Sequence, residues 1–194
     1  MIFQTCRSFT IEQPAEKQAA RGDTRRRILD AAQELAHDLG TTRLSLDAVA
    51  AKAGVSKGGL LYHFPSKSLL MEALVEDFLG RYDEAISAEE RTGEPNSAIR
   101  AYIAQFRAER GRGKTASSGL LAALAEDPDM LAPVRRRESD FLSRIRANAS
   151  DPQLATLAFL ALHGIRAMEL LNIRVLEAAD EDALLESLRD RLAV

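Results

Sequence analysis

The apolar positions of this chain recur mostly at steps of three and four residues, a spacing that places side chains on one face of an α-helix. In the segment 24–39 the apolar stripe consists of Ile28, Ala32, Leu35 and Leu39. Asp23 or Thr24 can cap the start of a helix here, and Gly40 can end it because glycine adopts the left-handed conformation at little cost. The pattern therefore predicts a helix over about 24–39, preceded by a flexible tail over 1–20.

Three shorter helices are predicted next, over about 46–53, 57–63 and 67–81. Gly54 can form the turn after the first of them, and Pro65 closes the second. Each helix follows a serine whose hydroxyl can accept hydrogen bonds from amides of the first helical turn. These serines are Ser45, Ser56 and Ser66.

The rest of the chain continues in the same way, and no alternating strand pattern competes with it. Helices are predicted over about 95–111, 116–126, 133–148, 152–173 and 180–193. The helix over 152–173 is apolar around most of its circumference, so it must be covered on several sides. The last helix has an apolar side made of Leu184, Leu185, Leu188 and Leu192. The sequence therefore predicts an all-α protein.

Charge is unevenly distributed along the 194 residues. The chain has 26 basic and 29 acidic residues, a net charge of −3, which argues against a protein that coats nucleic acid indiscriminately. The segment 21–67 nevertheless carries eight basic and five acidic residues. This asymmetry supports a small DNA-facing head on an acidic body, although differences of this size also arise by chance.

Residues 46–63 have the form of a helix-turn-helix, in which a short helix and a tight turn precede a helix that reaches base edges. Ala50 is small where the two helices approach, and Val55 and Leu60 can fill the space between them. Gly58 and Gly59 begin the second helix, where each costs roughly 1 kcal/mol relative to alanine. Close approach of the backbone to DNA would compensate for this cost; the alternative is that both belong to a frayed first turn.

The segments "TRRRILDAAQELAHDLG" and "LSLDAVAAKAGVSKGGLLYHFPSKSLLMEAL" together resemble the DNA-binding domain of TetR/AcrR-type regulators over residues 24–74. The resemblance implies that Ser45, Tyr62, His63 and Lys67 hold phosphates and that Lys57, Gly58 and Gly59 face bases. With Ser56, the predicted DNA-binding residues are Ser45, Ser56, Lys57, Gly58, Gly59, Tyr62, His63 and Lys67.

One position departs from the family pattern, because many relatives carry an aromatic residue where this chain has Leu61. Either Tyr62 or His63 can therefore be the residue that reaches a base. The alternatives are structural: Tyr62 packs against the first helix, His63 bonds locally, and the arginines at 25–27 form a solvated face.

The resemblance also implies a helical ligand-binding and dimerisation body over 76–194, behind a helix-turn-helix domain over 21–75. The last two helices, about 152–193, are the expected homodimer interface; the alternative is that the apolar helix is the core of a monomer. A small-molecule effector would bind in the body, although most of the candidate lining residues can equally be core. These candidates are Phe78, Tyr82, Tyr102, Phe106, Phe141, Phe159, His163 and Arg166.

The predicted function is a sequence-specific regulator of transcription, a repressor released from an inverted-repeat operator by a small molecule. The alternative is a constitutive helix-turn-helix regulator that acts through protein contacts. An enzyme is not expected, because the three histidines and Cys6 lack metal-ligand spacing, no nucleophile motif occurs, and the carboxylates are expected as helix-surface charges. No cofactor, metal or membrane span is expected, and the expected location is the cytoplasm.

Overall fold

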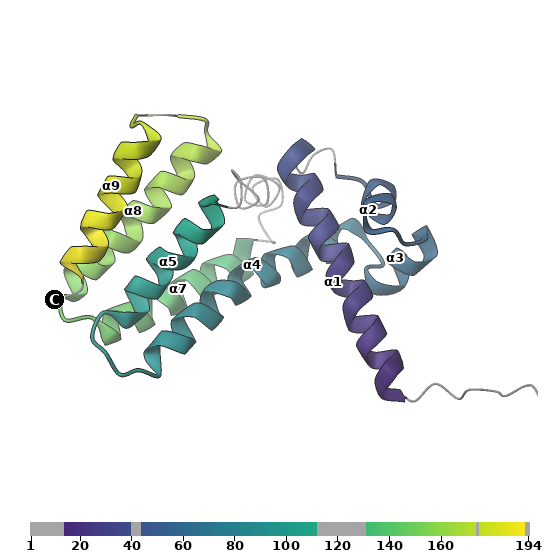
Figure 1. Cartoon of the computed structure of the whole chain (residues 1–194), viewed down its shortest axis with the longest axis horizontal. Helices are drawn as coiled ribbons and strands as arrows, with labels where there is room; N and C mark the ends of the chain where they lie inside the picture. Colours follow the sequence, from purple (N-terminus) through teal and green to yellow (C-terminus); the bar gives the residue numbers. More distant parts are fainter. Residues whose placement is uncertain (1–13, 40–43, 112–130, 174, 193–194) are drawn as a thin grey trace, which may run out of the picture.

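The computed structural model describes residues 14–39, 44–111, 131–173 and 175–192 (Figure 1). Within these ranges the chain forms eight helices and no strand, so the prediction of an all-α fold is confirmed. The helices are α1 (Pro14–Leu39), α2 (Leu46–Ala53), α3 (Lys57–His63), α4 (Lys67–Glu90), α5 (Ser97–Gly111), α7 (Leu131–Asn148), α8 (Pro152–Leu170) and α9 (Ala178–Arg191). None of these helices is long and apolar enough to cross a membrane.

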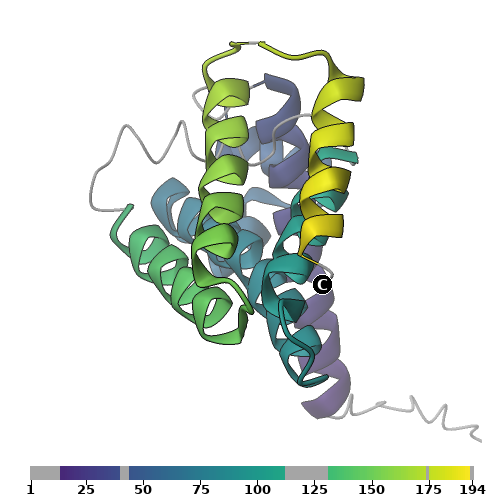
Figure 2. The same cartoon turned by 90° about the vertical axis from the view of Figure 1, so that its left-hand side faces the viewer.

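The helices form a head and a body that share one long helix. Figure 1 shows α1, α2 and α3 at one end, with α4 running from this head into a body built from α5, α7, α8 and α9. In Figure 2, α8 and α9 lie side by side on the side of the body that faces away from the head. The buried apolar side chains form one connected core that extends from α1 to α9.

Helix α4 is longer than the sequence pattern predicts, because it continues past residue 81 to Glu90. Ile86 is fully buried in this extra part. Arg144 of α7 also fastens it to the body, since its guanidinium donates to Asp83 at 2.5 Å and to Glu90 at 2.7 Å. The boundary predicted at residues 75–76 therefore falls inside a continuous helix.

The first helix begins earlier than expected. It starts at Pro14, whereas the apolar stripe predicts a start at Asp23 or Thr24, so residues 14–20 belong to a helix rather than to a tail. Proline is favourable at the first helical position, and the following Ala, Glu, Lys and Gln residues have high helix propensity without needing an apolar stripe. Residues 1–13, which include Cys6, and the helix predicted over 116–126 lie outside the described residues.

The start of α5 depends on a residue from another helix. Asn96 precedes the helix with a positive φ of 61°, and the Oδ1 atom of Asn148 accepts a hydrogen bond from the amide of Ala98 at 2.9 Å. The helix therefore begins at Ser97 and not at Pro95. The end of α7 supplies the cap that the sequence around α5 lacks.

Candidate nucleic-acid interface and the buried cluster of the body

The first turns of α2, α3 and α4 are built on serine caps, as the sequence predicts. The hydroxyl of Ser45 accepts from the amide of Ala48 at 3.1 Å, and that of Ser56 accepts from the amide of Gly59 at 3.0 Å. Ser66 caps α4 in the same way. These bonds satisfy amides that would otherwise be unpaired at the helix starts.

The turn between α2 and α3 is held by Gly54 and by a side chain from α1. Gly54 has a φ of 65°, a conformation that favours glycine. The guanidinium of Arg27 donates to the carbonyl of Ala53 at 2.6 Å and lies 3.3 Å from where a Cβ atom of residue 54 would be. Arg27 thus fastens the turn to α1, a role that the interpretation of residues 25–27 as a solvated face did not include.

The starts of α2 and α3 lie close together on the head. Lys57 Nζ is 2.9 Å from Asp47 Oδ1, and both side chains are largely exposed. Such a surface ion pair contributes about 0–1 kcal/mol, so Lys57 can leave it for a phosphate or a base at little cost. Gly58 is exposed beside it, and a Cβ atom there would meet no described heavy atom within 4 Å.

The end of α3 presents an exposed aromatic side chain. Tyr62 is 65% exposed, so it does not pack in the core against the first helix. Its ring meets the half-buried His63 edge-on, with 5.2 Å between the ring centroids. Lys67 is exposed at the first position of α4. Leu60 is fully buried, so α3 turns its other face to the core.

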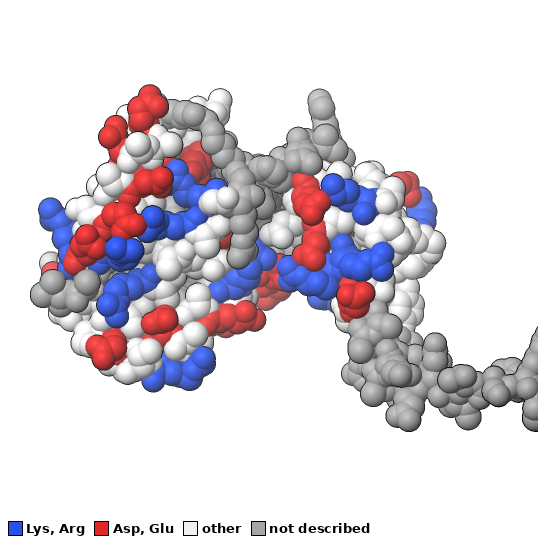
Figure 3. Space-filling view, in the orientation of Figure 1, with Lys and Arg blue, Asp and Glu red and all other residues white. Residues whose placement is uncertain are grey.

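Figure 3 shows basic and acidic side chains interspersed over the visible faces of both the head and the body. Among the α1 side chains that the structure describes, the exposed basic residues are Arg25, Arg26 and Arg27. Their positive charge is partly neutralised, since Arg26 pairs with Asp30 and Asp77, each at 2.7 Å.

The aromatic candidates of the body lie together in the core between α4, α5, α7 and α8. Tyr102 is at the centre, with its ring centroid 5.1 Å from that of Phe159 and 6.2 Å from that of Phe141. Its hydroxyl lies 3.3 Å from His163 Nε2. Burial raises the pKa of Tyr102 above its ordinary range, so this phenol stays protonated.

Arg166 is the most unusual member of this cluster, because it is a cation that is only 4% exposed. Its guanidinium lies over the ring of Phe106, 5.3 Å from the centroid, and its NH2 group donates to the hydroxyl of Tyr82 at 2.7 Å. A buried charge is unfavourable unless hydrogen bonds and neighbouring charges compensate for it. The structure thus brings the predicted ligand-binding residues together, but as a packed cluster with a polar centre.

Two carboxylates of the cluster were not predicted. The side chains of Glu109 and Glu138 are 12% and 18% exposed, so the expectation of helix-surface charges is wrong for them. Glu109 accepts from the hydroxyl of Tyr82 at 2.8 Å, and Glu138 accepts from that of Tyr102 at 3.1 Å. Helical spacing was the available signal, because Glu109 lies seven residues after Tyr102 and Glu138 lies three before Phe141.

Two family models match the chain. The model described as "Bacterial regulatory proteins, tetR family" matches residues 28–74, and the model described as "Tetracyclin repressor-like, C-terminal domain" matches residues 96–193. The chain belongs to the TetR family. The first match covers most of the head and the second covers the helices of the body from α5 onward, so head and body both carry the family pattern.

Among TetR-family proteins, the regulator BetI of Rhizobium meliloti (strain 1021) is 29% identical over 126 residues, which is 64% of this chain and 61% of BetI. The chain thus spans less than two thirds of the curated relatives that it matches first. A TetR-like regulator from Rhodococcus sp. RHA1 has a TM-score of 0.63 at 23% identity, covering 87% of this chain and 94% of that one. The multidrug-binding protein EbrR, complexed with malachite green, has a TM-score of 0.61 at 24% identity, covering 88% and 98%.

Within the described part of this TetR-family chain, no three His, Cys, Asp or Glu side chains are grouped in a way that would hold a metal ion. Two of the three histidines lie in different parts of the molecule: His63 is in the head, and His163 is in the body, where Glu138 Oε2 lies 3.4 Å from its Nε2 atom. In the buried cluster, Tyr82 bonds both Arg166 and Glu109.

Proposed function

We propose that this chain is a dimeric, sequence-specific DNA-binding transcriptional regulator, a repressor that a small molecule releases from an inverted-repeat operator. The proposal rests on the head, in which two capped helices, α2 and α3, are joined by a turn at Gly54. This arrangement leaves Lys57, Gly58 and Tyr62 of α3 exposed. This is the arrangement in which the second helix of a helix-turn-helix enters the major groove.

In the proposed complex, Lys57, Gly58 and Gly59 approach base edges, while side chains around them hold the phosphates. A serine hydroxyl that accepts a hydrogen bond from a backbone amide still has its own proton to donate. A capping hydroxyl can therefore also bind a phosphate oxygen. The proposed phosphate-binding residues are Ser45, Ser56, Tyr62, His63 and Lys67, with Tyr62 or His63 as the residue that also reaches a base.

The proposed dimer interface is the outer face of α8 and α9, and its occupant is a second copy of the chain. Leu157 and Leu160 are 64% and 55% exposed, and Leu171 and Leu184 extend the apolar surface along α8 and onto α9. An exposed apolar surface of this kind marks an interaction site. Figure 2 shows that this face points away from the head, so two chains can meet there with both heads free.

The proposed effector site is the buried cluster around Arg166. Buried charges with perturbed pKa values gather at functional sites, because a purely structural core is more stable without them. EbrR, which has the same fold, is described as a multidrug-binding protein in complex with malachite green. The second candidate is a constitutive regulator without a ligand, in which the polar cluster only orients the helices.

Selection of random duplex DNA by the purified protein tests the proposal. We expect an inverted repeat bound by two chains, with an affinity that falls steeply as salt rises. The double variant Lys57→Ala/Tyr62→Ala should lose this affinity. Lys52→Ala is the matched control, because it removes the same charge from an exposed lysine that pairs with Glu34 of α1 at 2.9 Å. Enrichment of no sequence by a folded protein would overturn the proposal.

The dimer and the effector are tested separately. Leu160→Glu should produce monomers in sedimentation equilibrium, whereas Ala104→Glu, which adds the same charge at an exposed position of α5, should not. Malachite green is the first effector probe: an effector must raise the melting temperature of the free protein and weaken its binding to the selected DNA. If no compound in a library of lipophilic molecules both raises the melting temperature and weakens DNA binding, the result would favour the constitutive regulator.

A further inference from the structure

We infer that a chain of polar side chains couples Arg166 in the core of the body to α1 of the head, and that Arg81 passes the change on by exchanging Asp77 for Glu109. The inference rests on the proposed function and deepens it, since it names the residues through which an effector in the body reaches the head. The contacts run from α8 through α4 and α5 to α1.

In the body, this series of contacts begins at Arg166, whose charge is stabilised by aromatic rings and a phenol. The guanidinium lies 5.4 Å from the ring centroid of Phe78 and 5.5 Å from that of Tyr82, and it donates to the Tyr82 hydroxyl at 2.7 Å. The carboxylate of Glu138 is 3.9 Å from NH1, beyond hydrogen-bond distance. A ligand that accepts from the NH2 group of this guanidinium therefore competes directly with the Tyr82 hydroxyl.

The Tyr82 hydroxyl joins Arg166 to Glu109. It accepts from Arg166 and donates to Glu109 Oε2 at 2.8 Å, while Gln105 donates to the other carboxylate oxygen at 3.3 Å. Burial raises the pKa of Glu109, and the hydrogen bond from Tyr82 and the charges of Arg166 and Arg81 counteract this rise in part. The charge of Glu109 thus depends on Arg166 on one side of it and on Arg81 on the other.

Arg81 has two acidic partners and satisfies only one of them. Its NH1 group bonds Asp77 Oδ2, whereas its Nε atom is buried 3.8 Å from Glu109 Oε1 and has no hydrogen-bond acceptor among the described residues. A buried donor without an acceptor is unfavourable, so a rotation that moves Arg81 onto Glu109 gains one hydrogen bond as it loses another. If the Tyr82 hydroxyl leaves Glu109, this second arrangement is favoured.

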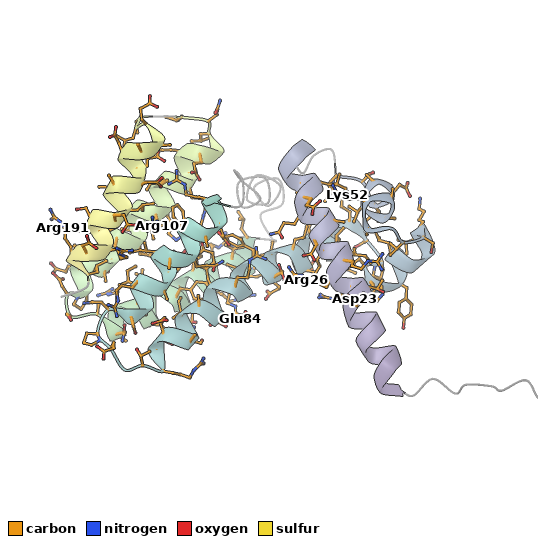
Figure 4. All side chains as sticks on the ribbon, viewed as in Figure 1. Asp23, Arg26, Lys52, Glu84, Arg107 and Arg191 are labelled. Carbon is orange, nitrogen blue, oxygen red and sulfur yellow. The ribbon has the colours of Figure 1, made fainter. Side chains whose placement is uncertain are left out.

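Asp77 carries the change to the head. Its Oδ1 atom accepts from Arg26 NH1 at 2.7 Å, and Figure 4 places Arg26 where α1 crosses α4. Asp77 and Arg81 are only 18% and 19% exposed, so salt screens their interaction less than that of a surface pair. When Arg81 leaves, the carboxylate that holds Arg26 is no longer oriented, and α1 is held less firmly against α4.

Hydrogen exchange of the free dimer tests this inference without DNA or effector. Arg166→Met should speed exchange of the α1 amides around Arg26 by up to about fivefold, which is the most that loss of the half-exposed Arg26–Asp77 pair can give. Asp77→Asn by itself removes the carboxylate that joins Arg81 to Arg26. In this background, Arg166→Met should therefore have no further effect on the exchange of these amides. Arg144→Met is the matched control, because this arginine also bonds α4, at Asp83 and Glu90, and none of its contacts with described residues leads to α1.

The inference is overturned if Arg166→Met leaves α1 exchange unchanged, if its effect and that of Asp77→Asn multiply as independent changes do, or if Arg144→Met acts equally. Should Arg166→Met not fold, Tyr82→Phe removes only the joining hydroxyl and must give the same result. The DNA selection tests the proposed function independently. If exchange shows the coupling but no DNA sequence is selected, the proposed function is overturned and the coupling stands. If a sequence is selected but exchange shows no coupling, the coupling is overturned and the proposed function stands.

Discussion

Gly58→Ala should change the stability and the DNA affinity of this protein in opposite directions. The residue lies in the first turn of α3, it is exposed, and a Cβ atom there meets no described heavy atom within 4 Å. The free chain can therefore accept alanine without strain. Since alanine has the higher helix propensity, the free energy of unfolding should rise by up to about 1 kcal/mol.

The same methyl group should weaken DNA binding, because it stands on the surface that is proposed to approach base edges. Base contacts contribute about 1–3 kcal/mol each, so displacement of α3 that breaks one of them lowers the affinity about 5- to 150-fold. Gly59 cannot serve for this test, since a Cβ atom there lies 3.2 Å from the capping hydroxyl of Ser56 and would disturb the helix start itself.

The assay combines thermal unfolding of the free protein with titration of the selected duplex. In a chain of this size about 1 kcal/mol corresponds to a rise of about 2–4 °C in melting temperature. Gly80→Ala is the control, because it makes the same change within α4 with no described atom within 4 Å and should stabilise without affecting DNA. A Gly58→Ala protein that binds the duplex with unchanged affinity would refute close approach at this residue.

Two further predictions concern the body. Asn148→Ala removes the acceptor of the Ala98 amide and should lower the free energy of unfolding in urea by about 1–3 kcal/mol, because a buried amide is left unpaired; an unchanged value would mean that water replaces the cap. The hydrogen bond from Arg144 lowers the pKa of Asp83, so its contribution to stability is complete above the unfolded pKa and disappears as the pH falls through the lower folded value. Asp83→Asn should therefore flatten the loss of stability between about pH 5 and pH 2 in acid titrations, and an equally steep loss would contradict this.

The α2–α3 unit of the head could be predicted closely from the sequence because its signals are local, unlike the start of α1. Ser45, Gly54 and Ser56 each act on amides or on a turn within a few residues, and the observed α2 begins and ends, and α3 begins, where these residues place them. Arg27 was missed for the opposite reason. Its partner, the carbonyl of Ala53, is 26 residues away, and nothing near Arg27 in the sequence distinguishes it from its solvated neighbours.

The body was predicted in outline only, because its decisive contacts join different helices. The end of α4 depends on Arg144, which lies 54 residues beyond Glu90, and the start of α5 depends on Asn148 in the same way. The aromatic candidates do lie together, but their acidic partners were hidden among many surface carboxylates. Its spacing from Phe141 places Glu138 on the same side of α7, but the burial of that side depends on packing against Tyr102 and His163 of other helices.

The two ways in which the head is held imply which of its parts can move. The α2–α3 unit is fixed by caps, by a left-handed turn and by buried side chains such as Leu60, so changing its internal geometry would break several interactions at once. The polar contact of α1 with α4 through Arg26 is an ion pair in which the arginine is half exposed, and such a pair contributes about 0–1 kcal/mol. A signal from the body therefore tilts the head as a rigid unit more readily than it reshapes α3. In the proposed dimer, joined at α8 and α9, a tilt would change the separation of the two α3 helices, and the fixed spacing of the proposed operator would convert that change into a loss of affinity.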